Sequence, residues 1–305
     1  MRKTIILTLT ATALIAGTLA EARPGDRLRE RIRSAETAAP IAQPPGKQTL
    51  SYGSDKLQAL DFYPAINGNK RAPLVVFVHG GGWQRGSKDN GTGQWKAPHY
   101  TGLGYAFVSI NYRLVPDATV EQQGADVAAA LRTLIDNAAR LGFDPTRIVI
   151  MGHSAGAHLV ALVGTDETYL RGAGLSFANL GGVIPIDGAA YDVAQQMQDG
   201  PGMMKDTYAQ AFGSDPARQR ALSPTLHAAS PNAPAFLIIH VGRQDGVAQS
   251  IKLESALKQG GTRVQRQQFD GRGLRGHMAI NRSLGDPAYP ATPVVDAWLK
   301  RVFGA

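Results

Sequence analysis

Arg147-Ile-Val-Ile-Met-Gly-His-Ser-Ala-Gly-Ala-His-Leu-Val160 reads as a short apolar strand that turns directly into a helix. The turn has the pattern G-x-S-x-G, with its serine at position 154. A serine on so tight a turn takes a strained backbone conformation, and side chains two residues to either side of it would collide. Gly152 and Gly156 remove those side chains, and the following helix directs its N-terminal N–H groups toward whatever the serine attacks. The spacing therefore predicts that Ser154 is an exposed nucleophile.

The rest of the chain alternates predicted strands with predicted helices. The strands are expected over residues 49–52 and 57–63, which form a hairpin, and over 74–78, 105–111, 183–186, 235–240 and 263–269. The helices are expected over 124–141, 251–259 and 293–302. This alternation predicts the α/β class, with a mostly parallel sheet covered by helices on both faces. Residues 188–234 are long for a connection, so we expect them to form a small cap over the site.

Composition excludes several kinds of chemistry. The 305 residues include no cysteine, which rules out disulfides, thiolate metal sites and a cysteine nucleophile. The net charge is +8, but residues 23–33 alone hold five arginines against Asp26 and Glu30, and the remaining excess is thinly spread. Because no stripe of alternating basic and aromatic residues is present, we interpret the charge as a solvated surface and expect no nucleic-acid partner.

The first 22 residues have the three parts of a secretory signal peptide. Met1-Arg2-Lys3 precedes an apolar run over 5–16, and Ala20-Glu-Ala22 resembles a cleavage site. The run is short for a membrane span, although an uncleaved anchor is the alternative. Residues 23–47 are rich in arginine and then proline, which indicates a disordered or tethering lead-in. We therefore expect a catalytic domain over 48–305, exported to the periplasm or the medium without stable membrane insertion.

A glycine-rich turn follows the strand that ends at Val78. Its sequence is His79-Gly-Gly-Gly-Trp83, and its glycines allow backbone N–H groups to point into a cavity. Attack on an acyl carbon creates an oxyanion that needs such donors, and the amide of Ala155 is the natural second contributor. A phosphate-binding loop over 81–88 is the rival interpretation. It fails because serine, where the motif requires lysine, follows the last glycine.

A nucleophilic serine needs a base, and His277 is the favoured histidine. It follows the last predicted strand in Gly273-Leu-Arg-Gly-His277, a stretch that predicts a flexible loop able to reach the strand ends. The other six histidines either brace the tight turns, neighbour the serine on its helix, or lack a supporting context: His79, His153, His158, His99, His227 and His240. The glycines at 271, 273 and 276 formally match a dinucleotide fingerprint, but they open no predicted helix.

Three aspartates follow predicted strands and could orient the base. They are Asp187, Asp245 and Asp270. The order Ser154, Asp245, His277 along the chain is that of the α/β-hydrolase triad, and glycines at 242 and 246 bracket Asp245. Asp245 is therefore the predicted acid, with Asp270 and Asp187 as its alternatives.

Together these motifs resemble the α/β-hydrolase esterases, in particular the small bacterial esterases and lipase-like enzymes related to hormone-sensitive lipase and kynurenine formamidase. The motifs that carry the resemblance are His79-Gly-Gly-Gly-Trp83, Asn111-Tyr-Arg113, Gly152-His-Ser-Ala-Gly-Ala-His158, Asp245 in Gly-x-x-Asp-x-Val, and Gly276-His277. The resemblance implies an α/β-hydrolase fold from about residue 48 to the C-terminus, with no metal or cofactor. It implies these roles: nucleophile Ser154, acid Asp245, base His277, and oxyanion donors Gly81, Gly82 and Ala155.

One departure bears on the substrate. The hormone-sensitive-lipase branch usually has aspartate where this chain has His153, which favours the feruloyl- and acetyl-esterase-like branch. We therefore expect a serine hydrolase that cleaves small-molecule carboxylic esters, with short acyl or aryl groups, through an acyl-enzyme. The alternatives are an amidase of the kynurenine formamidase type, a peptidase of the same fold and a non-catalytic binding protein.

Overall fold

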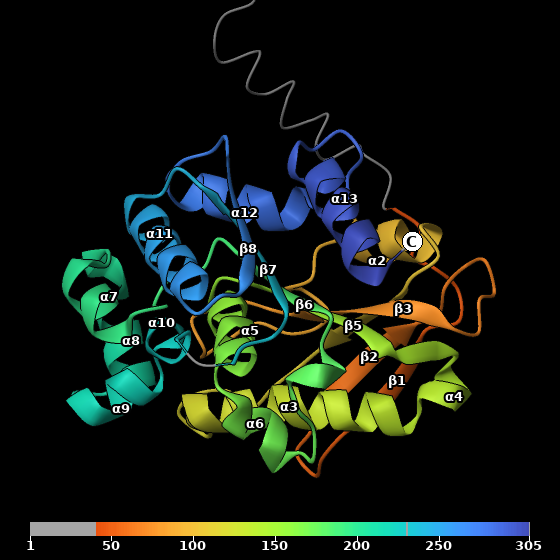
Figure 1. Ribbon diagram of the computed structural model, residues 1–305, viewed down its shortest axis with the longest axis horizontal. Helices are drawn as coiled ribbons and strands as arrows, with labels where there is room; N and C mark the ends of the chain where they lie inside the picture. Colours follow the sequence, from red (N-terminus) through yellow and green to blue (C-terminus); the bar gives the residue numbers. More distant parts are fainter. Residues whose placement is uncertain (1–40, 230, 305) are drawn as a thin grey trace, which may run out of the picture. The chain divides into compact units, whose positions relative to one another are not determined.

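The computed structural model describes residues 41–229 and 231–304, which are built around an eight-stranded sheet (Figure 1). The strands are β1 (Gln48–Ser51), β2 (Ala59–Tyr63), β3 (Ala72–Val78), β4 (Ala106–Ile110), β5 (Phe143–His153), β6 (Gly182–Ile186), β7 (Ala235–Val241) and β8 (Arg263–Phe269). Their order across the sheet is β1-β2-β4-β3-β5-β6-β7-β8. The β1–β2 and β2–β4 pairs are antiparallel, and all other pairs are parallel. The predicted mostly parallel sheet is confirmed.

Helices cover both faces of this sheet. They are α2 (Lys96–Gly102), α3 (Val120–Asp136), α4 (Ala138–Leu141), α5 (Ala155–Thr165), α6 (Glu167–Gly172), α7 (Val193–Asp199), α8 (Lys205–Phe212), α9 (Pro216–Ala221), α10 (Pro224–His227), α11 (Gln244–Gln259), α12 (Gly273–Ser283) and α13 (Ala291–Phe303), with 3-10 turns η1 (Phe177–Asn179) and η2 (Gly202–Met204). In Figure 1, α3 and α5 lie on one side of the sheet and α2 and α13 on the other. The predicted two-sided α/β architecture is therefore confirmed.

The central strands are buried on both faces because successive side chains enter two different cores. On β3, Leu74 and Val76 pack in the core that includes side chains of α3, α5 and α11, while Val75 and Phe77 pack in the core that includes side chains of α2, α12 and α13. Every residue of β3 is fully buried. A continuous apolar run is what such a strand requires, since neither face meets water.

Helix α3 begins earlier than predicted because a capping box starts it. The hydroxyl of Thr119 accepts a hydrogen bond from the N–H of Gln122, and the Gln122 side chain accepts one from the N–H of Thr119. The predicted helix 124–141 is also divided, because it breaks at Asn137 into α3 and α4. Gly142, in the left-handed region at φ 77°, ends α4 as predicted.

The last part of the chain is more helical than predicted. The expected flexible loop around His277 is helix α12, whose Ile280 is buried in the second core. Close packing explains the glycines there, since a Cβ on Gly276 would lie 2.7 Å from the carbonyl carbon of Gly271. Helix α11 starts at Gln244, well before the predicted residue 251, so Asp245 lies in its first turn.

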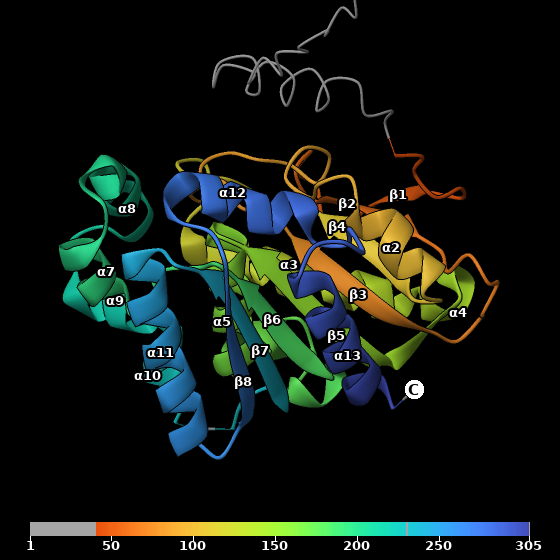
Figure 2. The same ribbon diagram turned by 90° about the horizontal axis from the view of Figure 1, so that it is seen from above.

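The insertion between β6 and β7 contains α7, η2, α8, α9 and α10. Figures 1 and 2 show α7, α8 and α9 gathered at one end of the domain, on the side of α11. This segment corresponds to the predicted cap over 188–234, and its service as a cap stays a prediction.

The predicted signal peptide, residues 1–22, lies outside the described residues, as does the lead-in as far as residue 40. Residues 41–47 run without regular structure into β1. In the part of the chain that the structure describes, no helix has both the length and the apolarity needed to span a bilayer.

Candidate active site

Ser154 occupies the strained turn between β5 and α5. Its backbone has φ 57° and ψ −117°, and its N–H donates to the carbonyl of Ile186 on the neighbouring strand at 3.0 Å. A Cβ on Gly152 would strike the carbonyl of Gly156, and one on Gly156 would strike the carbonyl of Val78. The predicted strain and the predicted need for both glycines are confirmed. The serine itself is half-buried and lines a cavity.

The glycine turn after β3 lies directly against Ser154, because a Cβ on Gly80 would lie 2.9 Å from the serine Cβ. Gly81 and Gly82 have φ of 133° and 63°, conformations that favour glycine. Within the described residues, their N–H groups find no hydrogen-bond acceptor. Ala155 is the first residue of α5, where the N–H has no partner inside the helix. The three predicted oxyanion donors thus belong to turns that meet at Ser154.

His277, on α12, pairs with a carboxylate and faces the same cavity as Ser154. Its Nδ1 lies 2.6 Å from Oδ2 of Asp187. Since a carboxylate only accepts, Nδ1 carries the proton and Nε2 is left to act as a base. The cavity has a volume of about 540 Å³ and is lined by Ser154, His277 and the glycine turn. The structure therefore brings the predicted nucleophile, base and glycine turn together.

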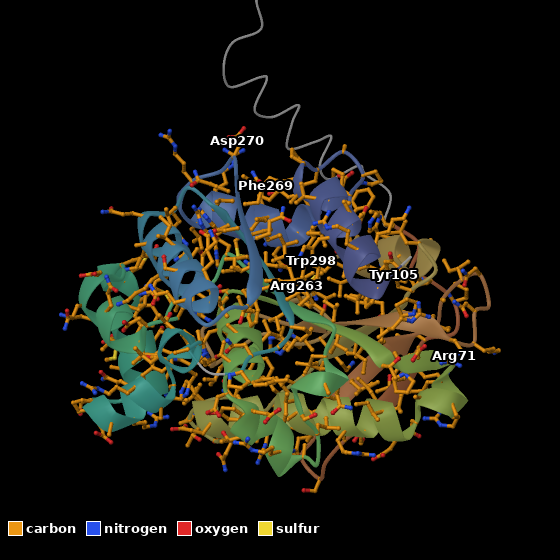
Figure 3. The ribbon with its side chains drawn as sticks, in the orientation of Figure 1. Arg71, Tyr105, Arg263, Phe269, Asp270 and Trp298 are labelled. Atoms are coloured by element: carbon orange, nitrogen blue, oxygen red, sulfur yellow. The ribbon has the colours of Figure 1, made fainter. Side chains whose placement is uncertain are left out.

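The predicted acid, Asp245, does not contact His277. Its Oδ2 instead accepts hydrogen bonds from Arg243 Nη1 at 2.7 Å and from Gln196 Nε2, on α7, at 2.9 Å. The physical reason is local: α11 begins at Gln244, which fixes Asp245 in a helical turn beside Arg243. Asp270 is exposed beyond the end of β8, where Figure 3 shows it at the edge of the ribbon. Asp187, the third candidate from the sequence, is the carboxylate that reaches the base.

Asp187 is held rigidly at the end of β6. It has φ 44°, its N–H donates to the carbonyl of Ile239 at 2.7 Å, and its Oδ1 accepts from the N–H of Val241 at 3.0 Å. Arg243 Nε stands 3.5 Å from its Oδ2. Burial disfavours the charged carboxylate, but the hydrogen bond from His277 and the charge of Arg243 hold the pKa of Asp187 below its ordinary value. The group is therefore ionised at neutral pH.

His153, the residue before the nucleophile, also contacts the base. Its Nε2 lies 2.9 Å from the carbonyl oxygen of His277, and the two ring centroids are 4.4 Å apart. Burial, and next the charge of His277, lower the pKa of His153 well below its ordinary value. The neutral ring therefore donates through Nε2–H to the His277 backbone. The prediction that His153 braces the turn is extended by this contact, because the ring also supports the base.

The remaining histidines make structural contacts. Nδ1 of His158 accepts from the indole N–H of Trp83 at 3.3 Å, and His79 stacks on Tyr112. Burial lowers the pKa of both His79 and His158 to about 4, so both rings are neutral. In the described residues, no group of three or more His, Asp or Glu side chains is placed to hold a metal ion.

Sequence reasoning did not single out Arg243 or Gln196, whose side chains both donate hydrogen bonds to Asp245. The only available signal was the spacing of Arg243 two residues before Asp245, a spacing common at helix starts.

Comparison with known proteins places this geometry in a family. A sequence model of the BD-FAE family matches residues 60–257. Carboxylesterase NlhH of Mycobacterium tuberculosis is 40% identical over 100 residues, which cover 33% of this chain and 30% of that protein. The matched stretch thus spans less than a third of this curated relative.

Solved esterase structures share the fold over most of the chain. Esterase B from Lactobacillus rhamnosis superposes with a TM-score of 0.70 at 22% identity, covering 92% of both chains. The butyrate-bound esterase Est2 from Thermogutta terrifontis superposes with a TM-score of 0.65 at 26% identity, covering 85% of this chain and 95% of its own. The α/β-hydrolase fold that the sequence motifs implied is confirmed.

Proposed function

Because the chain belongs to the BD-FAE family and has the α/β-hydrolase fold, we propose that it hydrolyses carboxylic esters through an acyl-enzyme on Ser154. The observation that carries the proposal is the meeting of three parts in one cavity: a serine on a strained turn, a histidine held by a buried carboxylate, and a glycine turn with free N–H groups. The relatives support it, since NlhH is described as a carboxylesterase and the superposed structures as esterases.

In this proposal each residue has a defined role. His277 Nε2 takes the proton from Ser154 as its Oγ attacks the acyl carbon, and the resulting oxyanion accepts hydrogen bonds from backbone N–H groups. His277 then returns the proton to the departing alcohol, which leaves the acyl group on Ser154. A water molecule, deprotonated in turn by His277, releases the acid and restores the serine.

Asp187 is the orienting acid in this proposal, in place of Asp245. Its hydrogen bond to Nδ1 selects the tautomer in which Nε2 is unprotonated, and its charge stabilises the imidazolium that forms. The donors proposed for the oxyanion are the amides of Gly81, Gly82 and Ala155.

Covalent labelling tests the nucleophile directly. A fluorophosphonate should add to Ser154 with loss of fluoride, shift the intact mass by one phosphonyl group and abolish hydrolysis of p-nitrophenyl acetate. Ser154→Ala should resist labelling and lose activity while unfolding at the wild-type temperature. Labelling at another residue, or hydrolysis that persists in Ser154→Ala, would contradict the proposal. A parallel assay with acetyl and formyl anilides separates an esterase from an amidase.

We also propose that the protein is exported and cleaved after Ala22, with the tripartite pattern of residues 1–22 as support. N-terminal sequencing of protein from the native host should give Arg23 or a close neighbour. Recovery of cytoplasmic protein that still begins at Met1 would contradict export.

A further inference from the structure

The cavity at Ser154 has positively charged side chains in its lining and no negatively charged ones. Among the residues that line it, Arg85 and Arg282 are charged and no aspartate or glutamate is present. Besides glycines, Ser154 and the two histidines, the rest of the lining is apolar or amide, such as the side chains of Met204, Met278 and Asn90. A cleft lined by one sign of charge focuses its field and raises the local concentration of ligands of opposite charge.

Neither guanidinium group has a partner among the described residues. Within residues 41–229 and 231–304, the side chains of Arg85 and Arg282 make no hydrogen bond and no ion pair, and both residues are exposed toward solvent. Several other arginines are paired, for example Arg113 with Asp126 at 2.7 Å and Arg218 with Glu121 at 2.7 Å. The cavity therefore presents donors that are free to bind a ligand.

The backbone beneath Arg85 is fixed to the glycine turn. Its N–H donates to the carbonyl of Gly81 at 3.2 Å, and a Cβ on Gly81 would collide with the carbonyl of Arg85. The Cα from which the Arg85 side chain extends thus has a fixed position relative to the proposed oxyanion donors.

The backbone beneath Arg282 is anchored as well. A Cβ on Gly93 would lie 3.5 Å from the Cα of Arg282, so the main chains of the two residues are in contact. The preceding residue, Asn281, is buried and receives a hydrogen bond from Lys96 Nζ at 2.9 Å. Since α12 also carries His277, the guanidinium group starts from the same rigid element as the base.

We propose that the cavity prefers esters that carry a carboxylate, which Arg85 and Arg282 bind while Ser154 attacks the ester. The planar guanidinium fork matches a carboxylate in two parallel hydrogen bonds, and such charge-assisted bonds are stronger than neutral ones. This inference rests on the proposed esterase function and narrows its substrate class. The carboxylate can belong to the acid or to the alcohol part of the ester.

Two matched pairs of esters test the preference. The acyl pair is p-nitrophenyl hydrogen glutarate against its primary amide, p-nitrophenyl 4-carbamoylbutanoate. The alcohol pair is 4-carboxyphenyl acetate against 4-carbamoylphenyl acetate. Rates are corrected for uncatalysed hydrolysis and normalised to the rate with hydroxide, so that leaving-group chemistry cancels within a pair. In at least one pair, kcat/KM should favour the carboxylate by about five- to tenfold at low salt.

Charge removal identifies the residues responsible. In Arg85→Gln/Arg282→Gln the ratio should fall to near one, and it should also fall in the wild type at high salt because the pairs are screened. Arg220→Gln is the matched control, since Arg220 is an exposed arginine on α9 outside the cavity lining; its ratio and activity should equal those of the wild type. Thermal unfolding establishes that each variant is folded.

The outcomes separate the inference from its premise. A preference in the acyl pair alone assigns the carboxylate to the acid part, and one in the alcohol pair alone assigns it to the alcohol part. Equal rates within both pairs, or a preference that survives in the double variant, would overturn the inference and leave the esterase intact. Failure to hydrolyse any of the four esters, together with no fluorophosphonate labelling, would overturn the proposed function and the inference with it.

Discussion

Arg243 makes the arrangement of carboxylates around the base possible. Its guanidinium group contacts Asp245 at 2.7 Å and stands 3.5 Å from Asp187, so one cation lies between two buried anions. It also donates to the carbonyls of Asp187 and Gly188, both at 3.2 Å. Without this cation the two buried carboxylates would repel each other with no opposite charge between them. Asp245 thus balances the charge of Arg243, while Asp187 is the carboxylate bonded to His277.

Exchanging each carboxylate for an amide tests this division of roles. Asp187→Asn should lower kcat by about 10⁴, because an amide no longer selects the useful tautomer of the base; this magnitude is that of the corresponding change in a serine protease. Asp245→Asn should lower kcat by less than about tenfold, since Arg243 keeps its contacts with Asp187 and the two carbonyls. Steady-state kinetics with p-nitrophenyl acetate measures both. The reverse ranking would restore Asp245 as the acid.

The glycine turn offers a second test at the level of a single residue. Gly81→Ala places a Cβ against the carbonyl of Arg85 and forces a side chain into φ 133°, so the turn must open and move its N–H groups. Loss of an oxyanion donor typically lowers kcat by about 10²–10³. Gly174→Ala is the control, because Gly174 has φ 70° with no atom within 4 Å of the added Cβ. An unchanged kcat in folded Gly81→Ala would remove this turn from the oxyanion site.

The strained turn at Ser154 and the glycine turn after β3 could be predicted because both depend on local spacing. Steric demands acting over two residues produce the G-x-S-x-G pattern, and the structure shows the same collisions at Gly152 and Gly156. The carboxylate that pairs with His277 could not be predicted with the same security. Three aspartates follow strands, and what distinguishes Asp187 is its hydrogen bond to a residue 90 positions away.

A buried lysine, which sequence reasoning did not single out, connects helix α12 to α2. Lys96, the first residue of α2, is fully buried, and its Nζ donates to the carbonyl of Thr92 at 2.7 Å and to the backbone and side-chain oxygens of Asn281. Asn281 in turn donates to the carbonyl of Gly91 at 2.9 Å. One ammonium group therefore joins α2, the turn around Gly91 and the helix of the base.

The predicted lengths of the elements were wrong where such long-range contacts determine the local structure. A stretch with three glycines predicts a loop, yet residues 273–283 are helical, because Ile280 enters the second core and Lys96 binds Asn281. In contrast, the central strands β3, β4, β6 and β7 were predicted close to their true bounds, because burial on both faces requires a continuous apolar run, which is visible in the sequence.

Lys96→Met should disturb α12 and reveal a pH dependence. Burial lowers the pKa of Lys96 to about 7 from its ordinary 10.5, so between these values the unfolded chain binds one proton more than the folded protein. Relative to Lys96→Met, the wild type should therefore gain stability as the pH rises above about 7, by up to about 1.4 kcal/mol per pH unit. Below pH 7 Lys96 is protonated in both the folded and the unfolded protein, so the difference in the free energy of unfolding between the wild type and Lys96→Met is constant. We also expect a lower kcat, because α12 carries His277.

Urea unfolding of the wild type and of Lys96→Met at pH 7 and pH 9 measures the difference between their free energies of unfolding. Lys258→Met is the matched control, because Lys258 is exposed on α11. The difference in the free energy of unfolding between the wild type and Lys258→Met should be the same at pH 7 and at pH 9. If the difference in the free energy of unfolding between the wild type and Lys96→Met does not change with pH, the Lys96 ammonium stays charged throughout this range.

At the scale of the whole domain, the parallel strands bring the site together. The ends of β3, β5 and β6 carry the glycine turn, Ser154 and Asp187, and parallel strands present their carboxyl ends at one edge of the sheet. The predicted α/β class already required this edge to hold the site. The two cores on either side of the sheet then fix the strands, so that strained residues at their ends are held in place.

The insertion between β6 and β7 contacts this edge of the sheet. Met204 lines the cavity, and a Cβ on Gly82 would lie 2.9 Å from Cγ2 of Thr207 on α8, so the insertion packs against the glycine turn. Gln196, on α7, binds Asp245 and the hydroxyl of Tyr208 on α8, which ties the same insertion to the start of α11. The insertion therefore packs against the glycine turn and supplies part of the cavity lining through Met204.

The size of this cavity predicts the acyl preference. Its volume of about 540 Å³ suits a small ligand, and its apolar lining is limited to side chains such as those of Met204, Leu274 and Met278. We expect kcat/KM for p-nitrophenyl esters to be highest at acyl chains of roughly two to six carbons, because longer chains must leave the cavity for water. A series from acetate to palmitate, measured below the critical micelle concentration, tests this. Met204→Ala should shift the optimum toward longer chains, whereas Met203→Ala, which alters a neighbouring methionine that is 83% exposed and outside the lining, should not. Rates that climb steadily to twelve carbons and beyond in the wild type would show that the insertion does not limit the acyl chain.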